Sequence, residues 1–176
     1  MRYRRAIAAG GIYFFTVNLA DRRSDYLVQH IGALRAATKT VKDAHPFEIL
    51  AMVVLPEHLH AIWRLPADDA DYPLRCSQIK AGFSRRLPKV EHINASRQTK
   101  RERGIWQRRY WEHQIRDEND LARHVEYIHY NPVKHGLVVS PANWPHSTLH
   151  RYIERGMVSA DWGRQVEGLT AGFGER

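Results

Sequence analysis

The chain has 176 residues, of which 43% are hydrophobic and 26% charged, a balance that predicts one globular domain and excludes global disorder. No apolar run reaches the roughly 20 residues of a membrane helix, and the single cysteine, Cys76, excludes an internal disulfide, so we expect a cytoplasmic protein with no membrane partner. The 27 Lys and Arg residues outnumber 19 acidic ones and give a net charge of +8. This charge is typical of nucleic-acid-binding proteins, but it also fits a basic enzyme that does not bind nucleic acid.

The first half of the chain alternates between strand and helix patterns. Runs of β-branched and aromatic residues are typical of strands, and apolar residues at every third or fourth position are typical of an amphipathic helix. His45-Pro46 ends the helical pattern, and Pro56-Glu57 marks a turn. The predicted elements are a strand over 12–19, a helix over 26–43, and a tight hairpin of strands over 48–55 and 58–65.

The second half adds two helices and one strand. The predicted segments are a loop over 66–73, a short basic helix over 77–87, a polar mobile segment over 88–104 and a fourth strand over 105–115. Asp117 is placed to cap a helix over 117–130. The order strand, helix, hairpin, helix, strand, helix predicts an α+β fold with helices packed on a mostly antiparallel sheet. We expect one domain over 1–163 and a frayed tail over 164–176.

His58 and His60 are the candidate metal ligands. Residues i and i+2 of a strand face the same side, so both imidazoles project side by side, and Leu59 and Ala61 take the opposite, apolar face. Two imidazoles can share one divalent cation. They are fewer ligands than a complete site needs, so a half-buried polar face is the alternative interpretation.

A polar stripe on the predicted helix over 117–130 complements the histidine pair. It consists of Asp120, His124, Tyr127 and Asn131. A phenol oxygen can attack phosphorus, and an amide oxygen can serve as a third metal ligand. Because Pro132 disfavours helix at the residue before it, we expect Asn131 in the last turn or just after it. Packing at the edge of the core is the alternative role for Tyr127.

A basic segment over 97–109 is the candidate DNA-binding region. It places six cations and one acid within 13 residues, together with Trp106, and Tyr110 and Trp111 follow directly. Cations bind phosphates and aromatic faces stack on bases, a combination suited to single-stranded or distorted nucleic acid, although the aromatics could equally pack in the core. The candidate contacts are Arg4, Arg5, Lys80, Arg85, Arg86, Arg101, Arg103, Trp106, Arg108 and Arg109.

Three motifs together resemble one protein family. Residues 56–63, PEHLHAIW, resemble the histidine–hydrophobe–histidine signature of HUH endonucleases, and residues 127–137, YIHYNPVKHGL, resemble the single-tyrosine motif of the Y1 transposases. Residues 104–112, GIWQRRYWE, are similar to the REP-associated branch of that family, as are Tyr3-Arg4-Arg5 and the NWPHS run at 143–147. The resemblance spans residues 1–163. Insertion-sequence members carry Gln at the position of Asn131, whereas the REP-associated branch carries Asn.

The resemblance implies a ferredoxin-like fold and a metal-dependent enzyme. The implied reaction is cleavage and rejoining of single-stranded DNA at REP-type hairpins, with Tyr127 as the nucleophile and a 5′-phosphotyrosine intermediate. The implied cofactor is Mg²⁺ or Mn²⁺, held by His58, His60 and Asn131, in a monomer or homodimer. A hairpin-binding protein with decayed catalysis, and a nuclease that uses water, are the alternatives. Glu57 is expected to be a surface turn residue, and orientation of His58 is the alternative role.

Overall fold

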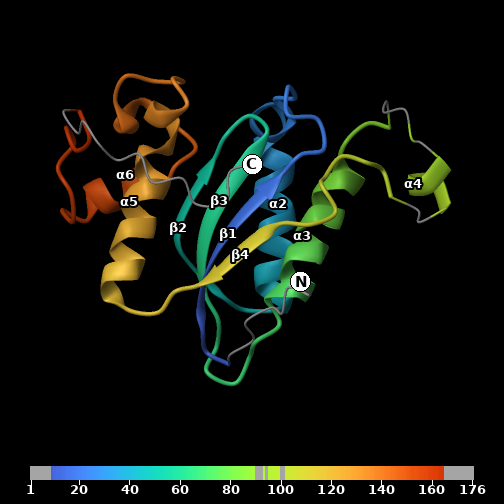
Figure 1. The fold of residues 1–176 in the computed structure, drawn as a ribbon, viewed down its shortest axis with the longest axis horizontal. Helices are drawn as coiled ribbons and strands as arrows, with labels where there is room; N and C mark the ends of the chain where they lie inside the picture. The colour runs from blue at the N-terminus through green and yellow to red at the C-terminus, as the bar shows by residue number, and fades with distance from the viewer. Residues whose placement is uncertain (1–8, 90–92, 94, 100–101, 165–176) are drawn as a thin grey trace, which may run out of the picture.

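The fold is built around one four-stranded antiparallel sheet, as the computed structural model of residues 9–89, 93, 95–99 and 102–164 shows (Figure 1). The strands are β1 (Ile12–Asn18), β2 (Glu48–Val54), β3 (His58–Arg64) and β4 (Trp111–Gln114). Their order across the sheet is β2-β3-β1-β4, with each neighbouring pair antiparallel. This order, with one helical connection before β2 and another before β4, is that of a ferredoxin-like fold.

Helices cover both faces of the sheet. They are α1 (Tyr26–Gln29), α2 (Ile31–Ala44), α3 (Tyr72–Arg86), α4 (Ala95–Thr99), α5 (Glu118–Lys134), the short 3₁₀ helix η1 (Pro141–Asn143) and α6 (Leu149–Glu154). Helices α2 and α3 pack against each other on one side of the sheet, and α5 and α6 lie on the other side (Figure 1). The predicted α+β class with helices on an antiparallel sheet is confirmed.

Strand alternation divides the core into two clusters. Leu59, Ala61 and Trp63 of β3 belong to the larger cluster under α2 and α3. Ile62 belongs to the smaller cluster, which also contains Ile128 of α5. Even-numbered residues of β3 therefore face α5, and this side includes His58 and His60.

Two helix boundaries differ from the expectation because of local backbone and capping. The helix predicted over 26–43 is interrupted at His30, whose φ of −111° and ψ of 34° are not helical. Helix α3 begins at Tyr72 rather than at Ser77. The Asp71 side chain accepts a hydrogen bond from the Leu74 N–H there, and a proline occupies the first turn.

Two further expectations were wrong at the ends of β4 and α5. Only Trp111–Gln114 of the strand predicted over 105–115 joins the sheet, and Trp106 instead forms an isolated bridge with Leu19. Pro132 does not end α5: it lies buried within the last turn, and the helix continues to Lys134. A proline there removes a single intrahelical hydrogen bond and leaves the preceding turns intact.

The remaining expectations concern the ends of the chain and the 88–104 segment. Residues 165–176 of the predicted tail lie outside the described residues, so the domain boundary stays a prediction. The segment predicted to be polar and mobile contains α4. Among the described residues, no helix is long and apolar enough to cross a membrane.

Candidate active site

His58 and His60 lie side by side on the face of the sheet that α5 covers. In the register of β1 and β3, His58 is opposite Asn18 and His60 is opposite Thr16. Both histidines are fully buried, and their ring centroids are 4.9 Å apart. The pair thus has the common orientation that strand alternation predicts.

Each of these histidines is oriented through its Nδ1 atom. Nδ1 of His58 lies 2.9 Å from Oε1 of Glu57, and Nδ1 of His60 lies 2.9 Å from Oγ1 of Thr16. A histidine that ligates a metal usually has its second ring nitrogen hydrogen bonded in this way, which fixes the ring and its tautomer. The Nε2 atom of His58 is buried and makes no hydrogen bond within the described residues.

Glu57 differs from the expectation of a surface turn residue. Its side chain is only 17% exposed, and Arg22 lies 3.5 Å from the oxygen that meets His58. Burial would raise the pKa of Glu57, but the hydrogen bond with His58 and the nearby positive charge bring it below its ordinary value. Glu57 is therefore ionised at neutral pH and acts as a positioning residue for His58.

Tyr127 of α5 contacts the histidine pair. Its side chain is 4% exposed, and its ring centroid lies 5.2 Å from that of His60. Lys134, two turns later on the same helix face, donates a hydrogen bond to Oη of Tyr127 at 3.4 Å and places its ammonium 4.9 Å from the ring centroid. The phenol is thus enclosed between an imidazole and a cation.

Asn131 lies on the same face of α5, one turn after Tyr127. It is fully buried. Two imidazole nitrogens and one amide oxygen would together suit a divalent cation. Tyr130 packs beside Gly163 instead, away from the histidine pair, so Tyr127 is the tyrosine of α5 that this site contains.

His135 is a site residue that the sequence analysis missed. It caps the C-terminus of α5, and its ring centroid lies 5.0 Å from that of His58. The sequence could have identified His135 by its spacing, because it lies four residues after Asn131 and continues the helical stripe that contains Tyr127.

A second group of possible metal ligands lies nearer the start of α5. One ligand atom each from His113, Asp120 and His124 falls within 4.8 Å of the others. Nε2 of His113 lies 2.8 Å from Oδ2 of Asp120, and Nδ1 of His124 lies 3.2 Å from its Oδ1. The two imidazole rings are stacked at 4.9 Å. Sequence reasoning found the Asp120–His124 stripe but had no signal that β4 brings His113 to it.

Asp120 should make a large, pH-dependent contribution to stability. Its burial would raise its pKa, but hydrogen bonds from His113 and Arg116 lower that pKa to about 2. Because the folded-state pKa lies below the unfolded value of about 4, this contribution is present above pH 4 and is lost as the pH falls from 4 toward 2. We expect Asp120→Asn to lower the free energy of unfolding near pH 7 by about 3 kcal/mol, measured by urea denaturation. An unchanged midpoint, or an unchanged loss of stability between pH 4 and pH 2, would contradict this expectation.

Several predicted DNA-binding residues line one groove. A cavity of about 890 Å³ lies between α3 and the segment 102–110. Its lining includes Lys80, Arg85, Arg103, Trp106 and Arg108. Three other candidates, Arg4, Arg5 and Arg101, lie outside the described residues.

Some of the groove residues make hydrogen bonds or packing contacts within the protein. The Arg103 guanidinium donates to the carbonyls of Ser84, Leu87 and Pro88 and so ties the end of α3 to the segment 102–110. Trp106 is 8% exposed and belongs to the core cluster under α2 and α3, as the packing alternative proposed. Its Nε1 donates to the Lys80 carbonyl.

The remaining candidate cations differ in how strongly they are held. Nζ of Lys80 donates to the Gln107 carbonyl at 2.7 Å, and burial lowers the pKa of Lys80. Arg86 turns toward α2, where it meets Thr40. Arg108 pairs with Glu102 at 2.8 Å at the surface. Arg85 and Arg109 are exposed and are the candidates best placed to meet phosphate.

Comparisons with known proteins agree with the fold and identify one family. No family model matches the chain. It is 47% identical over 162 residues, 92% of each chain, to a Haemophilus influenzae protein assigned to the REP-associated tyrosine transposases. It is 45% identical over 170 residues, 97% of this chain and 95% of the relative, to the REP-associated tyrosine transposase of Escherichia coli K12. A solved structure of a REP-associated tyrosine transposase bound to a REP hairpin superposes with a TM-score of 0.85 at 44% identity, covering 100% of this chain and 98% of that one.

Proposed function

This chain belongs to the REP-associated tyrosine transposases, and on that premise we propose that it cleaves and rejoins single-stranded DNA at REP-type hairpins with Tyr127 as its nucleophile. The observation that carries the proposal is the position of Tyr127, whose buried ring lies against His60 and beside the Lys134 ammonium. The test is incubation of the protein with hairpin-bearing single strands and Mn²⁺, followed by a denaturing gel.

The reaction exchanges one phosphodiester for another. The phenol of Tyr127 gives up its proton to water, Oη attacks the scissile phosphorus, and the bond from phosphorus to the 3′ oxygen breaks as the new bond to Oη forms. The leaving 3′ oxygen takes up a proton, and the 5′ phosphate stays esterified to Tyr127. Because the ester retains the energy of the original bond, the 3′-OH of a second strand can reverse the step and join the two strands without ATP.

His58, His60 and Asn131 would hold the divalent cation. When bound, Mg²⁺ or Mn²⁺ polarises a non-bridging oxygen of the scissile phosphate and offsets negative charge in the transition state. Glu57 and Thr16 contact the two imidazoles through Nδ1, so that Nε2 of each ring would be the ligating nitrogen.

The donor atoms distinguish this set from the His113, Asp120 and His124 group. In that second group, Nε2 of His113 already bonds to the Asp120 carboxylate, and Arg116 donates to the same carboxylate. Nδ1 of His124 bonds to the Asp120 main-chain carbonyl and also lies near the carboxylate. A cation there would have to replace these bonds. Nε2 of His58, by contrast, is buried and makes no hydrogen bond within the described residues, which supports this pair as the place of the metal.

Lys134 is proposed to stabilise the Tyr127 phenolate as it forms. Removing its charge with Lys134→Gln should slow cleavage roughly ten- to a hundredfold, because a hydrogen bond to a charged group contributes about 1.5–3 kcal/mol. Lys134→Arg should restore part of the rate. Single-turnover cleavage measures both, with hairpin affinity as the control for folding. Equal rates for Lys134→Gln and the wild type would remove Lys134 from the mechanism.

A further inference from the structure

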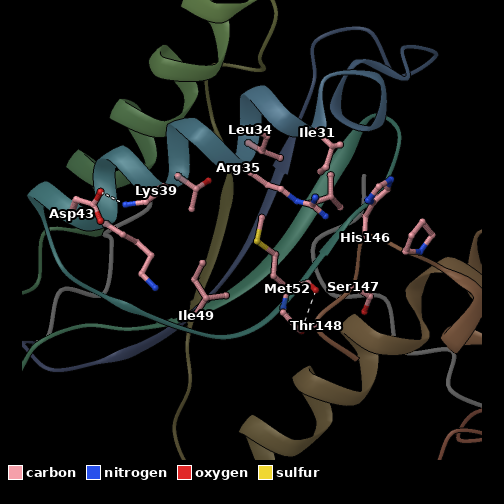
Figure 2. Close-up of a pocket in the computed structure, with 14 residues that line it drawn as sticks. Ile31, Leu34, Arg35, Lys39, Asp43, Ile49, Met52, His146, Ser147 and Thr148 are labelled. Atoms are coloured by element: carbon pink, nitrogen blue, oxygen red, sulfur yellow. Dashed lines mark hydrogen bonds and ion pairs between the residues drawn. The ribbon is translucent and has the colours of Figure 1, made fainter. Parts of the chain in front are cut away.

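A second groove lies on the opposite side of the sheet from Tyr127. It has a volume of about 510 Å³ and runs between α2 and the edge strand β2 (Figure 2). Ile31 and Leu34 of α2 and Ile49, Met52 and Val54 of β2 give it an apolar floor. None of the residues assigned above to catalysis or metal binding lines it.

The end wall of this groove is held firmly to the sheet. The His146 carbonyl accepts a hydrogen bond from the Val54 N–H at 2.9 Å, and the Thr148 Oγ1 accepts one from the Met52 N–H at 2.8 Å. The His146 side chain stands at this end of the groove (Figure 2), and its Nδ1 is buried and makes no hydrogen bond within the described residues. These hydrogen bonds fix residues 146–148 against β2, so this end of the groove is preformed.

Three cations line the α2 side of the groove. Arg35, Lys39 and Lys42 follow one face of the helix, about 6 Å and then about 4.5 Å apart along its axis. Asp43 is the acid of the lining and pairs with Lys39 at 2.6 Å, but these side chains are 63% and 76% exposed, so the pair is weak and exchangeable. The lining therefore carries an excess of two positive charges.

We infer that this groove binds single-stranded DNA that flanks the hairpin, a conclusion that rests on the proposed function. A row of cations at this spacing suits successive phosphates of an extended strand, and the aliphatic floor suits the sugars and base faces. Helix α5, which carries Tyr127, packs on the other face of β2, so the groove and the nucleophile lie on opposite sides of the same strand. The alternative occupant is an acidic protein, which would need apolar side chains that match the floor of the groove. The test below distinguishes it from DNA.

The test compares DNA with and without a flank. Binding is measured in the Tyr127→Phe background, so that cleavage does not interfere, with a blunt REP hairpin and with the same hairpin carrying a ten-nucleotide single strand. The groove variant is Arg35→Gln with Lys42→Gln, which leaves the Lys39–Asp43 pair in place. The control variant is Lys89→Gln with Arg155→Gln, which removes two exposed charges outside the groove.

We expect the groove variant to lose roughly tenfold in affinity for the flanked hairpin, with a salt slope lower by about 1.4 for two lost phosphate contacts. Its affinity for the blunt hairpin should match that of the control variant. Equal losses on both DNAs would assign the groove to the hairpin itself, and no loss on the flanked one would leave it to an acidic partner. Either result would overturn the inference. If the protein binds neither DNA, the proposed function itself fails.

Discussion

Tyr127→Phe is expected to abolish strand cleavage, with a fall in rate of roughly a thousandfold or more, and to leave hairpin binding within about twofold of the wild type. The substitution removes one oxygen and keeps the ring. The contacts of that ring with Phe14 at 6.1 Å and with His60 at 5.2 Å therefore survive, and so does the packing of α5.

No neighbouring hydroxyl on α5 can replace the lost nucleophile. Tyr130 packs beside Gly163, on another face of the helix. Single-turnover cleavage of a hairpin-bearing single strand with Mn²⁺ measures the rate, and Tyr130→Phe is the matched control, which should cut normally. Cleavage by Tyr127→Phe at the wild-type rate would mean that water or another tyrosine attacks.

His60→Ala is expected to remove metal-dependent cleavage, with a loss of roughly a hundredfold or more, and His58→Ala should behave alike. Each substitution deletes one of the two imidazoles that share a face of the sheet. Excess Mn²⁺ should restore part of the activity, because weak binding can be overcome by concentration. Mn²⁺ binding followed by electron paramagnetic resonance, with Tyr127→Phe as the control, separates the loss of a ligand from the loss of the nucleophile.

His113→Gln provides the comparison that distinguishes the two histidine groups. Glutamine can still donate to Asp120, so the connection between β4 and α5 is retained. We expect this variant to bind Mn²⁺ and cut DNA normally. If His113→Gln lost the metal while His60→Ala kept it, the ion would belong with Asp120 and His124.

The sheet and its helices were predictable because local patterns agree with the final packing. The alternation in β3 placed His58 and His60 on one face and Leu59 and Ala61 on the other before any tertiary contact was known. The sequence-based predictions were wrong where tertiary packing opposed the local conformational preference of a residue. Burial of the α5 face carries the helix through Pro132, although proline disfavours it.

The candidate site was only partly predictable because half of its contacts join distant segments. Helix spacing predicts that Tyr127 and Asn131 share one face of α5. The same spacing could have identified Lys134 and His135. The bond from His60 to Thr16 and the contact of His113 with Asp120 depend on strand order, which the sequence does not reveal. Trp106 was a candidate DNA contact with core packing as the alternative, and its indole packs against Phe83 in the core.

Isolation of the covalent intermediate tests the central claim most directly. The protein is incubated with Mn²⁺ and a hairpin-bearing strand labelled downstream of the cleavage site, and the adduct is digested and sequenced by mass spectrometry. The proposed mechanism predicts a 5′-phosphate esterified to Tyr127, together with a free 3′-OH on the upstream product. Cleavage without any protein-linked DNA, or a phosphate carried by a residue other than Tyr127, would contradict it.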